Sequence, residues 1–267
     1  CSESDSQMNR RLLSYEQLST AKESPMLTEL VQAGKLPPLE ERIPQEPLLV
    51  KPIESVGVHG GEWNFDVTTR RDINLVYHIA TPSFFRWAKD GYHFEPYLCK
   101  GYHLSKDGRV WTIYLRKGVR WSDGYPFTTE DVRFWYEDDA LNKDLNPLPK
   151  EELLIDNRLG KIEIVDDYTF RVVFPTSFKS FYQKMTSIVL FYVPSHYMKR
   201  FHIKYAKQEE LDQRLREAGV KKWSELYKRM ERWYLGYLDP NIPSLRPWLL
   251  TNKTVSPNTY EFVRNPY

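Results

Sequence analysis

The sequence has few cysteines, no long apolar run and nearly balanced charge. Only two of the 267 residues are cysteines, and none of the six histidines has the spacing of a metal site. No apolar run approaches the ~20 residues that span a bilayer, and the longest, 188–193, has the length of a strand. The net charge is +2 and the basic residues are scattered, which argues against nucleic acid as the main partner.

Recognisable catalytic motifs are missing as well. The chain has no glycine-rich phosphate loop, because Gly60-Gly61 alone lacks the pattern, and no G-x-S-x-G elbow or evident Ser/His/Asp set. One stretch gathers five carboxylates, which could include a pair for glycoside hydrolysis: Glu130, Asp131, Glu137, Asp138 and Asp139. We favour a structural interpretation, with the first two at a helix N-terminus, where the helix dipole favours negative charge, and the others on a solvated face. We therefore expect no enzyme activity, no metal and no cofactor.

What remains is a globular composition. Hydrophobic residues make up 41% and charged residues 28% of the chain, and the length suits one large domain or two small ones. Aromatic content is 15%, from 8 Trp, 18 Tyr and 13 Phe. Flat aromatic side chains can line a cleft for sugars or peptides, although for any single residue an ordinary core position is the favoured interpretation.

The first 50 residues are predicted to be an extension. Residues 12–18 and 25–33 have weak helical periodicity, and Gly34 could close the second helix. The stretch 37–52 contains five prolines and should run extended over a surface. A globular pattern begins near Gly60-Gly61, where 62–68 is predicted to be a strand, and 72–80 is ambiguous between helix and strand.

Two hairpins are the clearest local predictions. The first pairs 101–105 with 110–116 through a turn in which Gly108 suits a left-handed position, and it places Trp111, Ile113 and Leu115 on one face. The second pairs 161–165 with 168–174. Between them a helix follows Pro126, with Thr128 as N-cap and a core-facing stripe of Val132, Trp135 and Tyr136.

Helices and one more strand are predicted after the second hairpin. The sequence indicates a helix over 177–186, the apolar strand 188–193, and a helix that Pro194-Ser195 opens. Residues 209–218 form a charged helix closed by Gly219, and Ser224 caps a helix over 225–235. This irregular alternation indicates a mixed α/β or α+β architecture.

A long and specific pattern runs from Phe94 to Ala140. It consists of EPYL at 95–98, LSKDG at 104–108, WTIYLRKGVRWSDG at 111–124 and PFTTEDV at 126–132. Further agreement comes from DDYTF at 166–170 with VFP at 173–175, VPSHY at 193–197 and RNPY at 264–267. From about Lys51 to its end, the chain closely resembles the family 5 extracellular solute-binding proteins, the oligopeptide and dipeptide receptors of bacterial ABC importers.

The resemblance implies a periplasmic-binding-protein-like lobe of the large two-lobed class (cluster C, type II). Family members are roughly twice as long, so the chain is expected to be the N-terminal lobe alone, truncated before the second lobe. We expect an extension over 1–50 and the lobe over 51–267, with a hairpin-helix subdomain at about 94–200. The motif residues are expected to be scaffold. An isolated lobe should expose its cleft face and bind ligand weakly, because closure of two lobes supplies most of the desolvation.

The first residue predicts where the protein resides. Cys1 is followed by a polar acidic-serine tether, 2–7, and such a start resembles a mature bacterial lipoprotein, whose lipid is attached to that cysteine. The alternative is that the sequence happens to begin at a cysteine. Acylation of Cys1 would leave Cys99 without a disulfide partner, as a small buried hydrophobic residue. We expect an extracytoplasmic protein, lipid-anchored to the bacterial membrane in the periplasm or at the outer face.

The resemblance also implies a function. The expected ligand is an extracellular oligopeptide, which two lobes enclose before the closed receptor docks on the ABC permease. From position alone, the candidate ligand contacts are Tyr77, His78, Asn146 and Trp248, for each of which plain packing is an equal alternative. Two other functions stay open: binding of oligosaccharides by the same fold, and a structural or interaction role for a shortened lipoprotein.

Overall fold

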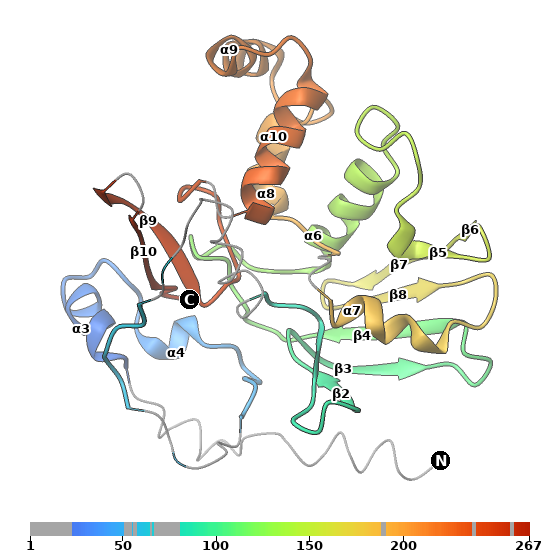
Figure 1. The fold of residues 1–267 in the computed structure, drawn as a ribbon, viewed down its shortest axis with the longest axis horizontal. Helices are drawn as coiled ribbons and strands as arrows, with labels where there is room; N and C mark the ends of the chain where they lie inside the picture. The colour runs from blue at the N-terminus through green and yellow to red at the C-terminus, as the bar shows by residue number, and fades with distance from the viewer. Residues whose placement is uncertain are drawn as a thin grey trace.

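A sheet of four antiparallel strands, in the order β3-β4-β8-β7, dominates the body of the molecule (Figure 1). The computed structural model describes residues 23–50, 55, 58–64, 66, 81–187, 191–236, 239–256 and 259–267. The strands are β3 (Cys99–Leu104), β4 (Val110–Leu115), β7 (Lys161–Asp166) and β8 (Thr169–Val173). Both predicted hairpins are confirmed, and the pairing of β4 with β8 joins them into one sheet.

The turn of the first hairpin depends on a glycine. Gly108 has φ +70°, a left-handed conformation that other residues rarely adopt. A Cβ at this position would come 2.5 Å from Ser177 Oγ. Ser105 Oγ and Asp107 Oδ1 both accept the backbone N–H of Arg109, so local hydrogen bonds hold the turn and set the register of the strands.

One face of the sheet carries the core. Trp111, Ile113 and Leu115 of β4 are buried, as predicted. Helix α6 (Thr129–Arg133) packs on β7 (Figure 1) and continues as the π-helix η2 (Phe134–Ala140). Helix α7 (Tyr182–Met185) packs on strand β1 (Phe85–Trp87). The largest fully buried aromatic side chains are Trp111, Trp121, Tyr192, Tyr227, Phe84, Phe85, Phe127, Phe134, Phe170, Phe174 and Phe181. Much of the aromatic content is therefore core.

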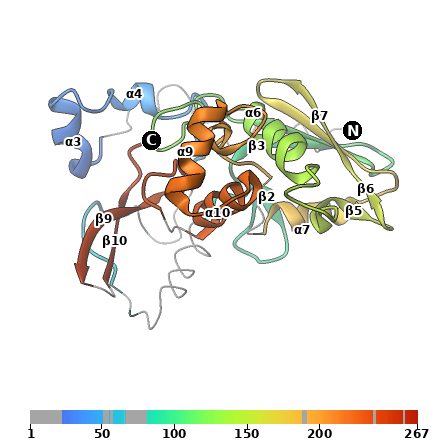
Figure 2. The same cartoon turned by 90° about the horizontal axis from the view of Figure 1, so that it is seen from above.

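Short hairpins and helices complete the described chain. Strand β1 pairs with β2 (Phe94–Pro96), β5 (Leu154–Ile155) with β6 (Arg158–Leu159), and β9 (Trp248–Ser256) with β10 (Thr259–Arg264). The other helices are α3 (Pro25–Gln32), α4 (Leu39–Arg42), η3 (Glu151–Leu153), η4 (Lys179–Phe181), α8 (Ser195–Met198), η5 (Lys199–Phe201), α9 (Gln208–Ala218) and α10 (Trp223–Gly236). In Figures 1 and 2, α9 and α10 are seen between the β9–β10 hairpin on one side and α6 on the other. None of the described helices has the length and apolarity needed to cross a membrane.

Helix α6 begins as the sequence predicts. Thr128 is its N-cap, with Oγ1 accepting the backbone N–H of Glu130, and Asp131 Oδ2 in return accepts the N–H of Thr128. The same Asp131 carboxylate accepts Trp121 Nε1–H at 3.1 Å and the N–H of Ser195 at 2.9 Å. A helix cap, a buried tryptophan and the start of α8 therefore share one buried acceptor.

The π-helix η2 contains three of the five carboxylates noted in the sequence, Glu137, Asp138 and Asp139, here called the acidic cluster. A π-helix has more residues per turn than an α-helix, so consecutive side chains are separated by a smaller angle and can both point inward. Asp138 and Asp139 are both buried, which contradicts the solvated face predicted for them. Asp138 pairs with Lys204 at 2.8 Å, and Asp139 accepts Asn146 Nδ2–H at 2.8 Å. The cluster thus connects η2 to the segments that follow it.

Several predicted elements differ in the structure. Phe191–Val193, the described end of the predicted strand 188–193, forms no strand and is buried in irregular chain, so its apolarity reflects burial and not strand pairing. The predicted helix over 177–186 is shortened to η4 and α7, because Phe178 donates its N–H to Gly108 O in the hairpin turn. Residues 62–64 and 66, the described part of the predicted strand 62–68, are not in a strand.

The helices nearer the two ends of the chain agree only in part with the prediction. The proline-rich segment 37–52 contains the one-turn helix α4 instead of running extended throughout, since Pro38 precedes it and Glu40 and Glu41 lie in its first turn. Helix α10 begins at Trp223, so Ser224 lies inside it. Helices α3 and α9 form as predicted, and Gly219 closes α9 in the left-handed conformation. The predictions for 12–18 and 72–80 lie outside the described residues.

Cys99 is a buried core residue, as predicted. Its Sγ–H donates to Phe84 O at 3.1 Å. Burial raises the pKa of the Cys99 thiol to about 12, so the thiol stays protonated at neutral pH.

Replacing the shared acceptor should destabilise the fold. We expect Asp131→Ala to lower the free energy of unfolding by about 2–4 kcal/mol, because three N–H groups lose their acceptor in the interior. Urea unfolding followed by tryptophan fluorescence measures the change. Glu137→Ala is the matched control, since this side chain is 51% exposed and pairs with Arg133, and it should cost less than about 1 kcal/mol. Equal losses in both variants would contradict the role given to Asp131.

Asp139 should make stability depend on pH. Burial, followed by the charge of Glu231, raises the pKa of Asp139 from 3.8 to about 6, although Lys228, Lys150 and Asn146 oppose the rise. The folded state thus holds this proton more tightly than the unfolded chain does. The stabilising contribution is therefore complete below about pH 4 and is lost as the pH rises through about 6.

We expect Asp139→Asn to reduce the loss of stability that accompanies a rise from about pH 4 to 7, as measured by thermal unfolding. Asp138→Asn is the control, because the pKa of Asp138 is shifted in the opposite direction. Although burial opposes it, hydrogen bonds from Lys204 and Tyr205 lower the pKa of Asp138, so its carboxylate stabilises the fold at neutral pH. A pH profile that is unchanged in Asp139→Asn would contradict the assignment.

Candidate ligand groove

An open groove of about 460 Å³ lies where three parts of the chain meet: the turn after Trp121, helices α8 and η5, and the segment that leads into β9. Its lining residues are Ser122, Asp123, Tyr197, Arg200, Pro240, Asn241, Ile242, Pro243 and Leu249. The size falls within the range of small-ligand sites, and the lining combines apolar walls with a few polar groups. This groove is the candidate functional site.

The turn at 121–124 forms one border of the groove. Trp121 is buried, and its backbone N–H donates to Tyr125 O, while the N–H of Gly124 donates to Trp121 O. Gly124 has φ +85°, and a Cβ there would come 2.9 Å from Tyr267 Oη. Glycine is thus required both by the left-handed backbone and by the close approach of a tyrosine.

The segment before β9 is fastened to this turn. The N–H of Ser122 donates to Ser244 O, and the N–H of Ser244 donates to Ser122 Oγ, both at 3.0 Å. Asn265 Nδ2–H donates to Ser244 O and to Arg246 O, and Asn265 Oδ1 accepts the N–H of Tyr267. The RNPY motif therefore has a physical role: its buried asparagine holds the wall of the groove in place.

The N-terminal segment supports the same region. Arg42 is buried and donates to the carbonyl oxygens of Pro37 and Pro266, and it pairs with Glu23. Arg120 Nε–H, from the turn region, donates to Glu41 O. Helix α4 and the C-terminus of the chain lie side by side in Figure 1. The residues around α4 are consequently part of the packed body.

The carboxylates near the groove already have partners. Asp123 Oδ2 lies 2.8 Å from His196 Nε2, and the His196 ring stacks on Tyr125 with ring centroids 4.1 Å apart. Asp239 Oδ1 accepts both the backbone N–H and the Nδ2–H of Asn241. These bonds order the rim of the groove.

Tyr197 and Arg200 form the opposite wall. The Arg200 guanidinium lies 4.0 Å from the centroid of the Tyr197 ring, and Arg200 Nε–H donates to Tyr197 O. Burial, followed by the charge of Asp239, raises the pKa of Tyr197. Its hydroxyl is therefore neutral at physiological pH and able to donate a hydrogen bond, beside an exposed cation.

Of the two predicted ligand contacts that the structure describes, Trp248 lies beside the groove and Asn146 does not. Trp248, at the start of β9, is 41% exposed and precedes the lining residue Leu249. Successive residues of a strand point to opposite faces, so Trp248 presents its ring on the other side of β9. Tyr77, His78 and Cys1 lie outside the described residues.

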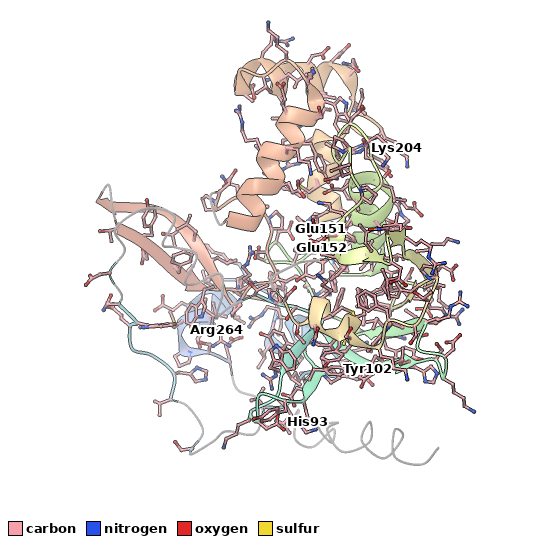
Figure 3. All side chains as sticks on the ribbon, turned by 45° about the vertical axis from the view of Figure 1, so that its right-hand side comes forward. His93, Tyr102, Glu151, Glu152, Lys204 and Arg264 are labelled. Atoms are coloured by element: carbon pink, nitrogen blue, oxygen red, sulfur yellow. The ribbon has the colours of Figure 1, made fainter. Side chains whose placement is uncertain are left out.

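Asn146 lies in another part of the molecule. Its Nδ2–H donates to the backbone and side-chain oxygens of Asp139, and its Oδ1 accepts Lys228 Nζ–H. This polar network adjoins the Asp138–Lys204 pair, whose lysine is labelled at the helical end of the molecule in Figure 3. Arg264, the last residue of β10, is labelled far from it in the same view. The side chain of Asn146 is thus engaged within the protein.

Sequence reasoning missed the lining residues Tyr197, Arg200 and Asn241. Two signals could have pointed to them. The VPSHY motif places Tyr197 next to a conspicuous helix start, and the prolines at 240 and 243 bracket Asn241 in a segment of irregular chain. Neither signal shows that these segments meet the turn at 121–124, because that contact is between residues far apart in the sequence.

Comparison with known proteins identifies the family. The model of the bacterial extracellular solute-binding proteins, family 5 (middle part), matches residues 93–267. The chain belongs to this family. The resemblance inferred from the 94–140 pattern is confirmed, and the mixed α/β fold matches that of periplasmic binding proteins.

The relatives include receptors named for different ligands. A periplasmic alpha-galactoside-binding protein of Rhizobium meliloti (strain 1021) is 30% identical over 217 residues, which are 73% of this chain and 31% of the relative. The structure of an oligopeptide-binding protein, OppA, superposes with a TM-score of 0.77 at 34% identity, over 94% of this chain and 40% of that chain. MelB of Agrobacterium fabrum C58, in complex with stachyose, superposes with a TM-score of 0.67 at 26% identity, over 92% and 38%. The chain thus spans 31–40% of the length of these proteins.

Removing the asparagine of the RNPY motif should loosen the groove wall. We expect Asn265→Ala to reduce stability by about 1–3 kcal/mol and to speed hydrogen exchange of the backbone amides of Ser244 and Arg246, since three internal hydrogen bonds are lost. Hydrogen exchange followed by mass spectrometry measures the effect. Arg264→Ala changes the neighbouring exposed residue and should leave this protection unchanged. Equal exchange in the wild type and in Asn265→Ala would refute the role of the asparagine.

Proposed function

We propose that this chain is part of the substrate-binding component of an ABC importer, and that the complete receptor captures extracellular oligopeptides. Membership of the solute-binding family carries the proposal. The peptide is favoured because the likeness to OppA, with a TM-score of 0.77 at 34% identity, exceeds the likeness to stachyose-bound MelB, with 0.67 at 26%. The groove supports it by its size and by its mixed polar and apolar lining.

The chain would contribute the first lobe of such a receptor. We assign the lobe to 51–267 and the extension to 1–50, with the hairpin-helix subdomain at about 94–200 built from the four-stranded sheet and the helices from α6 to α8. The contacts of Arg42 with Pro266 support a packed position for the end of the extension, next to the groove. A second lobe would close over this face, and closure is the step that removes water from the ligand.

The ligand contacts would come from the groove and its surroundings. We assign direct contacts to the groove residues Tyr197, Arg200 and Asn241. Trp248 is retained as a contact for ligand that extends beyond the groove to the exposed face of β9, and Tyr77 and His78 are retained as contacts from the segment before β1. Asn146 would act indirectly, through the network of Asp139.

The proposed location is extracytoplasmic, in keeping with the extracellular character of the family. The sequence Cys1 followed by a polar tether supports a lipid anchor on the cell membrane. From there the receptor would deliver its ligand to the transmembrane subunits of an ABC permease.

Uptake by intact cells tests the ligand class. We expect deletion of the gene that encodes this chain to reduce the uptake of labelled tri- to pentapeptides by tenfold or more, and reintroduction of the gene to restore it, because import requires the binding component. Uptake of free alanine is the control and should not change. Normal peptide uptake in the deletion strain would reject the proposed ligand.

The oligosaccharide alternative has a specific observation in its favour. The alpha-galactoside-binding relative aligns over 73% of this chain, and MelB was solved with stachyose. Loss of raffinose or stachyose uptake, with peptide uptake intact, would establish this alternative. Intact uptake of both classes would favour the third possibility, a structural or interaction lipoprotein.

A further inference from the structure

Five aromatic side chains of the β1–β2 hairpin, β3 and α7 are exposed or half-buried, and they are here called the aromatic face: Trp87, Tyr92, Phe94, Tyr102 and Tyr182. Trp87 and Phe94 are opposite one another in the hairpin, and the Phe94 ring stacks on Tyr182 with centroids 4.2 Å apart. Tyr182 also contacts Trp87, and Tyr102 lies 5.3 Å from Phe94. Four of the rings therefore form one surface, and Tyr92, which is 85% exposed, lies in the hairpin loop beside it.

The aromatic face is separate from the candidate ligand groove. None of its five residues lines the groove. Figure 3 labels Tyr102 and His93, the neighbour of Tyr92, at the lower end of the view, and Lys204 at the opposite end. A function of this face would accordingly be distinct from the capture of a ligand.

The polar atoms of the aromatic face are free to bind other groups. Within the described part of the chain, the hydroxyls of Tyr92, Tyr102 and Tyr182 and the indole N–H of Trp87 have no hydrogen-bond partner. The rings thus contact one another while their polar tips face water. Tryptophan and tyrosine with this combination are enriched where a bilayer meets water, with the ring at the level of the lipid headgroups.

Lysines without carboxylate partners flank the aromatic face. Lys89 lies in the hairpin loop, and Lys179 lies on η4, three residues before Tyr182. Because side chains three residues apart lie on the same side of a 3₁₀ turn, Lys179 projects on the side of Tyr182. Both lysines are exposed, and no carboxylate of the described residues pairs with either ammonium group.

The nearby carboxylates have partners of their own. Glu95 of β2 pairs with Arg86 at 2.7 Å. Asp90, in the hairpin loop, lies 2.6 Å from His93 Nδ1 and also accepts the backbone N–H groups of Tyr92 and His93. The face therefore presents aromatic rings, free donors and net positive charge, which complement a surface of phosphate-bearing headgroups.

We propose that the aromatic face binds the surface of a lipid bilayer that contains anionic phospholipids. The rings would lie at the level of the headgroups, and the two lysines would pair with headgroup phosphates. This inference goes beyond the proposed function, since it holds whichever ligand the receptor captures. A lipid anchor at Cys1 would hold the chain near the membrane, and this second contact would set its orientation there.

Sedimentation of the unacylated 267-residue chain with vesicles tests the proposal. The vesicles are phosphatidylcholine alone, or phosphatidylcholine with about 30% phosphatidylglycerol, at about 0.1 M salt. We expect the anionic vesicles to bind the chain about tenfold more tightly, since each lysine near such a surface contributes about fivefold. Trp87→Ala/Tyr92→Ala should weaken binding to both kinds of vesicle about tenfold. Lys89→Gln/Lys179→Gln should remove the preference for the anionic vesicles.

Matched variants elsewhere on the surface are the controls. Leu148→Ala removes an apolar side chain that is 79% exposed. Lys221→Gln/Lys222→Gln removes two exposed lysines between α9 and α10 that no carboxylate of the described residues pairs with. Binding should be unchanged in both. Tyr92→Ala alone should weaken binding about threefold and leave the thermal unfolding curve unchanged, so that lost binding is not confused with lost fold.

The outcomes separate this inference from the proposed function. A wild-type chain that binds neither kind of vesicle would overturn it, and so would equal losses in the face variants and the controls. Equal binding of the wild type to both kinds of vesicle would overturn the role of the lysines. Undiminished binding in Trp87→Ala/Tyr92→Ala, with a thermal unfolding curve like that of the wild type, would place the membrane contact elsewhere. None of these results bears on peptide uptake, so either proposal can fail without the other.

Discussion

The carboxylate of Asp131 is the interaction on which the described structure most depends. A buried charge is tolerated only when donors surround it, and here the donors come from the Trp121 indole, the N-cap Thr128 and the first residue of α8, Ser195. The turn at 121–124 and helix α8 form two borders of the groove. One acceptor therefore fixes both borders relative to the hairpin-helix core, and the shape of the groove follows from the satisfaction of a buried charge.

The third border of the groove, the segment before β9, is also held by hydrogen bonds from buried side chains. Asn265 satisfies two carbonyl oxygens of the segment before β9, and Arg42 satisfies the carbonyl of Pro266 and that of Pro37. Segments from the N-terminal region, the middle and the end of the chain thus meet at one place, as Figure 1 shows for α4 and the C-terminus. Irregular chain can form a defined wall here because its backbone oxygens are bonded to buried side chains and not left to solvent.

The sequence predicted correctly the turns and helix ends that depend on interactions between neighbouring residues. The hairpin turn at Gly108, the capping of α6 by Thr128 and the closing of α9 by Gly219 each depend on neighbouring residues, and each forms as predicted. The π-helix could not be predicted in this way, and it reversed the expected exposure of Asp138 and Asp139. The groove could not be predicted either, because Tyr197, Asn241 and Ser122 become neighbours only through long-range contacts. The apolar run ending at Val193 led to a wrong strand prediction, because apolar periodicity does not distinguish a strand from buried irregular chain.

The aromatic content, which suggested a cleft for sugars or peptides, does not discriminate between the two ligands. The largest rings lie in the core, where Trp111 and Trp121 use their indole N–H groups to bind Phe178 O and Asp131. Tyr197 is the aromatic residue that lines the groove, and a guanidinium already covers its ring. A sugar could stack on that face of Tyr197 only after displacement of Arg200. The aromatic composition of the chain therefore does not by itself favour either ligand class.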